Sequence, residues 1–188
     1  DGDGPQVPLN PDDAFPMAST FKVAVAAAVL AKVDAGELAL TTMVPVPMAM
    51  HVDSEVIADR FIPEGLSLSI HNLLEVMLTQ SDNTATDVLV EQAGGPAAVT
   101  AWLRAQGIEG QRLDRNTRDL LIEFYGVTDA GPLTKARAAE LARDPVFVAR
   151  RGTPNTAFDA DPRDTSTPRA MSTLLTRLFS GDALSADS

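Results

Sequence analysis

Apolar residues recur at helical spacing over much of the chain. Residues Ser19–Asp34 are rich in Ala, Val and Leu and are apolar on nearly every side, which is typical of a buried helix. Further along, helical patterns are broken by Gly, Pro or small polar residues that favour helix ends. The pattern predicts further helices at Ser69–Thr79, Thr84–Ala93, Pro96–Gln106, Arg118–Tyr125, Thr134–Arg143 and from Thr167 to the stop at Gly181.

The segments between these helices read as loops or short extended pieces. Residues 41–65 are interrupted by prolines, which favour extended loop with one short strand at Met43–Met48. Asp144-Pro145 and the stretch Gly152–Pro162 also read as loop. In the helix that ends at Thr79, we expect four side chains to face the core: Leu73, Leu74, Met77 and Leu78. The chain is therefore mostly helical, with too few strands for a sheet of its own.

Composition and charge narrow the class of protein. The 188 residues are 45% hydrophobic and 22% charged, which suits a globular domain with its own core. The net charge is −11, and residues 1–100 hold 14 acidic and only 3 basic residues. Such a surface repels nucleic-acid phosphates and anionic membranes, so we expect neither as a partner. The longest apolar run, Val23–Ala31, is too short to span a membrane, and the absence of cysteine excludes thiol chemistry.

The strongest chemical signal is Ser19 followed three residues later by Lys22, at the head of the predicted buried helix. Residues three apart on a helix lie on one face, about 5–6 Å between Cβ atoms, so the amine can approach the hydroxyl. An amine removed from water loses charge more easily and can act as a base. A serine that caps the helix, with an unrelated lysine after it, is the alternative reading.

A second signal is the tripeptide Ser81-Asp82-Asn83, which lies between two predicted helices. A serine hydroxyl can relay a proton, and an asparagine amide can bind a substrate carbonyl. In isolation the tripeptide also reads as a loop with a helix N-cap. His51 and His71 have no partner pattern for a metal, and we expect neither a metal nor a cofactor.

Together, these motifs resemble those of the class A β-lactamases, within the wider group that includes penicillin-binding proteins. The resemblance spans most of the chain in the family's order. It is carried by Phe15–Lys22, Ser81–Ala85, Gly94-Gly95-Pro96, Leu113-Asp114-Arg115 and Asp161–Met171. It implies an α+β fold of the serine β-lactamase and D,D-peptidase type, of which this chain supplies mostly the all-helical domain.

The resemblance also implies roles for particular residues. Ser19 would be the acylated nucleophile, its backbone N–H half of the oxyanion hole, and Lys22 its base. Ser81 would pass the proton to the leaving lactam nitrogen, and Asn83 would bind the substrate's acylamide. Arg115 and Asp164 would form the ion pair that closes the omega loop at its neck, although such a pair can also be a surface contact of little energetic value.

Two departures from the family concern the deacylation step. The family has a Glu two residues after the omega-loop arginine, where this chain has Thr117, which cannot act as a general base at neutral pH. The family's Asn further along the loop is replaced by Leu121. Asp119 and Glu123 are candidate substitute bases, or else belong to a solvated helix face. The segment from Arg115 to Asp164 is also much longer than the family's loop, so it must form an excursion over or beside the site.

A third motif of the family, Lys-Thr-Gly, is missing. The lysines are Lys22, Lys32 and Lys135, and none precedes Thr-Gly. We therefore expect a fragment, inactive by itself, that lacks both ends of the family's fold. Residues 1–188 would form one partial domain, in which 1–18 and 36–65 are the edge of the α/β part. Residues 66–181 would be the helical domain with an enlarged omega loop at 115–164.

The favoured function is a serine hydrolase that opens β-lactams through an acyl-enzyme on Ser19 and deacylates slowly. The alternatives are a D,D-peptidase-like or esterase-like acyl hydrolase and a catalytically dead penicillin-binding scaffold. The partner would be a small-molecule β-lactam or a peptidoglycan-like acyl substrate. By resemblance, the full-length protein would be a periplasmic or secreted monomer.

Overall fold

The computed structural model describes residues 9–54, 56–61, 63–127, 133–186 and 188. Within these residues most of the regular structure is helical, with a 3₁₀ turn at Ala18–Phe21 and another at Met48–Met50. The α-helices are α1 (Lys22–Asp34), α2 (Ile57–Arg60), α3 (Ile70–Gln80), α4 (Asn83–Ala93), α5 (Pro96–Ala105), α6 (Thr117–Tyr125), α7 (Lys135–Leu141), α8 (Pro145–Arg151), α9 (Thr156–Asp159) and α10 (Pro168–Ser180).

The strands are short and pair in two separate antiparallel ribbons. They are β1 (Phe15–Pro16), β2 (Met43–Pro45), β3 (Ser67–Ser69) and β4 (Thr165–Ser166). β1 pairs with β4, with Phe15 opposite Ser166, and β2 pairs with β3, with Val44 opposite Leu68. The β1–β4 ribbon holds the chain just before Ser19 against the chain just after Asp164, so the two segments reach the site together.

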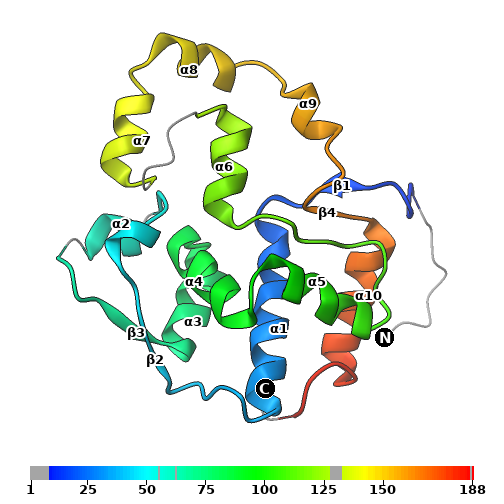
Figure 1. The fold of residues 1–188 in the computed structure, drawn as a ribbon. Helices are drawn as coiled ribbons and strands as arrows, with labels where there is room; N and C mark the ends of the chain where they lie inside the picture. Colours follow the sequence, from blue (N-terminus) through cyan, green and yellow to red (C-terminus); the bar gives the residue numbers. More distant parts are fainter. Residues whose placement is uncertain (1–8, 55, 62, 128–132, 187) are drawn as a thin grey trace.

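Helix α1 lies at the centre of the helical part and packs against α3, α4 and α5 (Figure 1). Val25 and Val29 in its middle are fully buried, as are Leu73 of α3 and Leu89 of α4. Leu174 of α10 joins the same core cluster. This confirms the prediction of a buried helix that begins near Ser19, and it fixes the first turn of α1 inside a rigid core.

Helix ends follow the capping signals in the sequence. The Ser69 hydroxyl accepts a hydrogen bond from the Asn72 N–H at 3.1 Å, and Thr167 does the same for Ala170 at 3.1 Å. Such caps satisfy N–H groups that have no partner inside the helix. Prolines stand in the first turns of α5, α8 and α10, where a missing N–H costs nothing.

Several local predictions are wrong, and the first is the extended loop expected at 41–65, which contains the 3₁₀ turn Met48–Met50 and helix α2. Asp144-Pro145 is the start of α8, because the Asp144 carboxylate caps it through the Val146 N–H at 2.8 Å. The stretch Gly152–Pro162 contains the short helix α9, capped by Asn155. Leu78 is 53% exposed, whereas Leu73, Leu74 and Met77 are buried, because Leu78 lies at the edge of the apolar stripe of α3.

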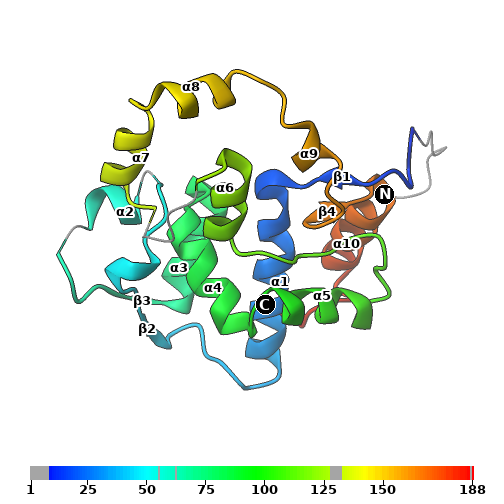
Figure 2. The same cartoon turned by 45° about the horizontal axis from the view of Figure 1, so that its top comes forward.

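Helices α7, α8 and α9 form an arch that stands beside α6 in both views (Figures 1 and 2). Aromatic rings tie the arch to α6: Tyr125 contacts Phe147 of α8, and Phe124 contacts Phe158 of α9, each with ring centroids 5.0 Å apart. Among the described residues, no helix combines the length and the apolar character that a membrane crossing requires.

Candidate active site

The Ser19 hydroxyl is exposed at the head of α1, on a 3₁₀ turn that runs directly into the helix. The preceding residue, Ala18, has a φ of 46°, a left-handed conformation that is costly for a residue with a Cβ. Strained backbone of this kind persists where the surrounding structure enforces it, often at functional sites. Lys22, the first residue of α1, is only 3% exposed.

The junction between α3 and α4 brings Ser81-Asp82-Asn83 to the same place. Ser81 ends α3 in a left-handed conformation, with φ of 55°. Asp82 caps α4 by accepting a hydrogen bond from the Ala85 N–H at 2.8 Å. Its other oxygen accepts bonds from the Ser54 hydroxyl and the Ile57 N–H, both at 2.9 Å. The buried Asp82 side chain therefore fixes the loop that carries Ser81 and Asn83.

The Lys22 amine is the centre of the site. It donates to the Ser81 carbonyl at 2.6 Å, to the Ser81 hydroxyl at 2.9 Å and to Asn83 Oδ1 at 2.9 Å. The Ser81 hydroxyl donates in turn to the Ser19 hydroxyl at 3.1 Å. Among these described residues no direct hydrogen bond joins Lys22 to Ser19, so the contact expected from their spacing is made through Ser81. The three acceptors satisfy all three N–H bonds of the ammonium group.

Burial lowers the pKa of Lys22 to about 8, against the opposing pull of the Asp82 and Asp87 carboxylates. Desolvation disfavours the charged form of an amine, and a pKa near the operating pH is what a general base requires. A neutral amine two hydrogen bonds from an exposed serine hydroxyl can accept that hydroxyl's proton.

Arg115 and Asp164 form a buried ion pair at the two ends of segment 115–164. Arg115 Nε lies 2.5 Å from Asp164 Oδ2, and the two side chains are 5% and 2% exposed. Asp164 Oδ1 also accepts hydrogen bonds from the N–H groups of Asp114 and Arg115, at 2.7 and 3.0 Å. The pair therefore joins the ends of the segment next to the β1–β4 ribbon.

Glu123 and Asp119, the two candidate bases, lie on α6 away from this hydrogen-bond chain. Glu123 is bound by Arg115 and Arg163, each at 2.6 Å. The hydrogen bond from Arg163, with further contributions from Arg115, lowers the Glu123 pKa. Asp119 is exposed in the first turn of α6. In the part of the chain that the structure describes, neither carboxylate makes a hydrogen bond or an ion pair with Ser19, Lys22 or Ser81.

Asp87 is a site residue that sequence analysis missed. It is 4% exposed on α4 and accepts hydrogen bonds from the N–H groups of Thr117 and Arg118, at 2.6 and 3.0 Å. Burial raises its pKa to about 6, although these two hydrogen bonds favour the charged form. The sequence does contain a signal for a buried acid, because Asp87 lies within the mostly apolar stretch Ala85–Val90 of a predicted helix. Asp87 holds the start of α6, and with it Thr117, against the helix that carries Asn83.

The mostly helical fold that positions these residues matches the structures of class A β-lactamases. The chain belongs to the β-lactamase enzyme family, whose family model matches residues 2–188. This confirms the resemblance inferred from the sequence motifs.

Solved structures give the same result. An ancestral class A β-lactamase, of the last common ancestor of Gram-negative bacteria, is 36% identical with a TM-score of 0.72; the match covers 98% of this chain and 57% of that one. A β-lactamase from Xanthomonas campestris is 31% identical, with a TM-score of 0.72 and coverage of 99% and 56%. The chromosome-encoded enzyme of Vibrio parahaemolyticus is 29% identical, with a TM-score of 0.70 and coverage of 95% and 54%. The chain thus spans little more than half the length of the structures it matches.

Proposed function

We propose that the protein containing this chain is a serine hydrolase that opens β-lactam rings through an acyl-enzyme on Ser19. The observation that carries the proposal is the chain of contacts from Lys22 Nζ to the Ser81 hydroxyl, at 2.9 Å, and on to the Ser19 hydroxyl, at 3.1 Å. An exposed hydroxyl linked in this way to a buried amine of lowered pKa is an activated nucleophile. Membership of the β-lactamase enzyme family supports the choice of substrate.

In the proposed acylation, Ser19 Oγ attacks the lactam carbonyl carbon. The Ser19 proton passes through Ser81 to the neutral Lys22 amine. The carbonyl–nitrogen bond of the ring then breaks, and Ser81 delivers a proton to the leaving nitrogen while Lys22 replaces the proton on Ser81. The product is an ester on Ser19 with an opened ring, and no proton is gained or lost overall. The Ser19 N–H would supply one donor to the developing oxyanion.

Asn83 would hold the substrate's acylamide. Its Oδ1 is already bound to Lys22, and its Nδ2 donates to the Asp53 carbonyl at 3.0 Å. An amide nitrogen has two N–H bonds, so the second can bind a substrate carbonyl. The Arg115–Asp164 pair would close an enlarged omega loop and keep it next to the site.

We further propose that deacylation is slow. Thr117 has no proton-accepting group at neutral pH, and Leu121, which stands where the family has an Asn, offers a water molecule no polar partner. Asp119 and Glu123 stay as candidate bases. A carboxylate held by two arginines is a weak base, which counts against Glu123 more than against Asp119. Replacing each by its amide would identify a base, because only the true base would trap the acyl-enzyme.

A second candidate is a D,D-peptidase-like hydrolase, which the same observation supports. An enzyme of that kind acylates with β-lactams and stays acylated, and Thr117 and Leu121 suit a long-lived acyl-enzyme. The two candidates differ in turnover: a β-lactamase regenerates free enzyme, whereas a peptidase keeps the adduct. Both would act on small acyl substrates in a periplasmic or secreted monomer, as the family resemblance implies.

Labelling with a fluorescent penicillin tests the proposed nucleophile in the full-length protein. We expect a single labelled residue, Ser19, and no label in Ser19→Ala. The matched control is Ser172→Ala, which removes an exposed hydroxyl from α10 and should keep full labelling. Label that survives Ser19→Ala in folded protein would contradict the mechanism.

A further inference from the structure

A pocket of about 300 Å³ lies between the C-terminal end of α6 and the turn that joins α8 to α9. Residues 123–126 line one side, and Arg150 with residues 153–155 lines the other. Figures 1 and 2 show this end of α6 facing the arch. The volume lies at the lower end of the range for small-molecule sites. All of these lining residues belong to the enlarged segment 115–164, and none of them belongs to the proposed catalytic cluster.

The Arg150 guanidinium is fixed in position at this pocket. Its Nη1 donates a hydrogen bond to the Gly126 carbonyl at 3.1 Å, just past the end of α6, where the helix dipole favours a cation. The approach is so close that a Cβ on Gly126 would lie 1.9 Å from Nη1, and the φ of Gly126 is 64°. Glycine is therefore required here, and the place of the guanidinium is set before any ligand binds.

Arg150 brings a positive charge to the pocket without a carboxylate partner. In the part of the chain that the structure describes, the contact with Gly126 is the one hydrogen bond of its side chain. Because an arginine has several further N–H donors, two of them can hold a carboxylate in the paired geometry that arginine favours. Glu123 on the opposite wall does not use this charge, because Arg115 and Arg163 each bind it at 2.6 Å.

The other walls supply an amide and aromatic rings. The Asn155 Nδ2 donates to the Phe124 carbonyl at 2.9 Å, and its Oδ1 accepts from the Phe158 N–H at 3.1 Å. The second N–H of this amide can donate to an anion. Phe124 is 37% exposed and packs edge-to-face on Tyr125, with ring centroids 5.0 Å apart. The lining therefore suits an anion that is attached to a flat apolar body.

We propose that this pocket binds a small aromatic carboxylate. The carboxylate lies against Arg150, with the Asn155 amide as a further donor, and the aromatic ring of the ligand packs on Phe124 and Tyr125. The proposal goes beyond the proposed function, because it needs neither the nucleophile nor any reaction.

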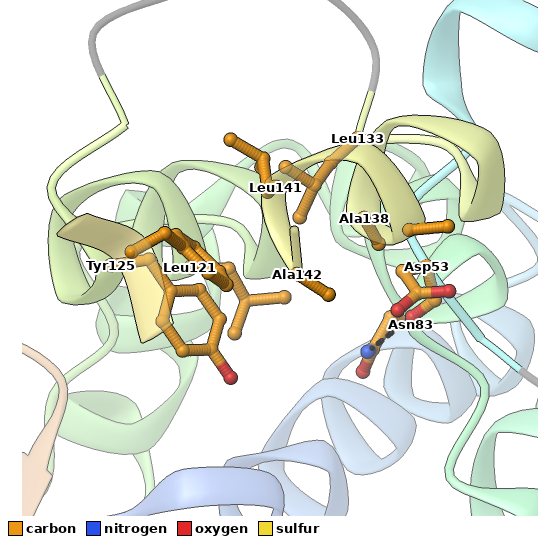
Figure 3. Close-up of a pocket in the computed structure, with 10 residues that line it drawn as sticks. Asp53, Asn83, Leu121, Tyr125, Leu133, Ala138, Leu141 and Ala142 are labelled. Carbon is orange, nitrogen blue, oxygen red and sulfur yellow. Dashed lines mark hydrogen bonds between the residues drawn. The ribbon is translucent and has the colours of Figure 1, made fainter. Parts of the chain in front are cut away.

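This site is separate from the pocket of about 400 Å³ that begins at Asn83 (Figure 3). Among the described lining residues, the two pockets share only Tyr125, so this residue forms part of both walls. A ligand in the pocket at Arg150 thus contacts a residue that also borders the proposed active site, without entering that site.

Binding of 4-fluorobenzoate to the full-length protein, followed by fluorine NMR, tests this proposal. We expect saturable binding. The uncharged 4-fluorobenzamide has the same ring but cannot pair with a guanidinium, and should bind about tenfold more weakly. Binding that is absent, or equal for the two compounds, would overturn the proposal.

Two arginines of the arch locate the bound carboxylate. Arg150→Met removes the charge from the pocket while keeping a long side chain, and should weaken 4-fluorobenzoate binding about tenfold. The matched control is Arg143→Met, which removes an exposed arginine between α7 and α8 that does not line the pocket, and should leave the affinity unchanged. Equal affinity in the native protein and in folded Arg150→Met would contradict the proposal.

A second pair of variants covers the case in which Arg150→Met fails to fold. Thr153 is exposed on the wall of the same pocket. Thr153→Glu adds a negative charge there and should abolish 4-fluorobenzoate binding, whereas Thr153→Gln, of nearly the same size, should keep it. Equal affinities in these two variants would overturn the proposal. None of these measurements involves acylation, so their result stands whether or not Ser19 reacts with a β-lactam.

Discussion

The proposed catalytic cluster, formed by Ser19, Lys22 and Ser81-Asp82-Asn83, and segment 115–164 differ in how their polar groups are held. In the cluster, Lys22 and Asp82 are almost fully buried, and each makes three hydrogen bonds within the helical core. Among the described residues of the segment, some ion pairs reach the surface; Arg163, for example, is 41% exposed in its pair with Glu123. The buried Arg115–Asp164 pair and the Asp87 contacts are two of the points at which the segment is tied to the core.

This structural difference corresponds to the two steps of the proposed reaction, acylation and deacylation. The groups proposed for acylation lie on α1 and at the α3–α4 junction, where packing fixes each atom. The candidate groups for activating water lie on the long segment 115–164, where Asp119 is exposed and Glu123 is paired with two arginines. Exposed ion pairs contribute little to stability, so the excursion can vary in sequence at small cost. We expect substitutions in the core to abolish acylation, and substitutions in the segment to change the lifetime of the acyl-enzyme.

The largest effect should come from Lys22→Ala. Without the base, acylation of Ser19 should slow by about 10²–10⁴-fold, measured by stopped-flow with a fluorescent penicillin. In the native protein the rate should rise tenfold per pH unit and level off near pH 8, because the pKa of Lys22 is lowered to about 8. The control is Lys32→Ala at the other end of α1, which should keep the native rate and profile. A native profile that stays flat from pH 6 to 8 would exclude Lys22 as the base.

Removal of one partner of the buried ion pair should have the next largest effect. Arg115→Ala leaves the buried Asp164 carboxylate without its positively charged partner. Breaking a buried ion pair in this way costs about 3–5 kcal/mol of stability. Urea denaturation of native and variant protein measures this free energy of unfolding. Arg163→Ala, in the exposed part of the same cluster, should change stability little. Equal losses of unfolding free energy in the two variants would show that the buried pair stabilises the protein no more than the exposed pair does.

A smaller, pH-dependent effect should come from Asp87. Its pKa is raised from 3.8 to about 6, so the folded protein binds this proton more tightly than the unfolded chain. Its contribution to stability is therefore greatest below pH 4 and declines as the pH rises to 6. At about 1.36 kcal/mol per unit, the decline is about 3 kcal/mol. The free energy of unfolding of Asp87→Asn should lack this decline, whereas Glu91→Gln, on the exposed side of α4, should retain it.

Much of the helical part could be predicted because its signals are local. The apolar run of α1, the Ser69 cap and the glycines after α4 and α10 each act within one or two turns. The same holds for Ser19 with Lys22, three residues apart, and for Ser81 with Asn83. The sequence did not reveal that Ser81 would stand between Lys22 and Ser19, because that depends on how α1 packs against the α3–α4 junction.

The remaining features depend on tertiary contacts. Asp87 appears in the sequence as one acid within an apolar helix, and only the position of α6 shows that it holds Thr117 and Arg118. A pocket of about 400 Å³ is lined by residues of α6, α7 and α8 together with Asp53 and Asn83 (Figure 3), and no short stretch of sequence contains all of them. The start of α8, by contrast, depends on a local signal. Asp144-Pro145 is typical of a helix N-terminus as well as of a loop, and the loop prediction is wrong here.

The most direct test of the central claim is the intact mass of the full-length protein at intervals after mixing with benzylpenicillin. A core equipped for acylation beside a segment without a strong base predicts a single adduct on Ser19 that forms quickly and persists, with a burst followed by weak turnover. A protein that hydrolyses the antibiotic efficiently while no adduct accumulates would contradict this account. It would place an effective base, Asp119 or Glu123 first among the candidates, within reach of the acyl-enzyme.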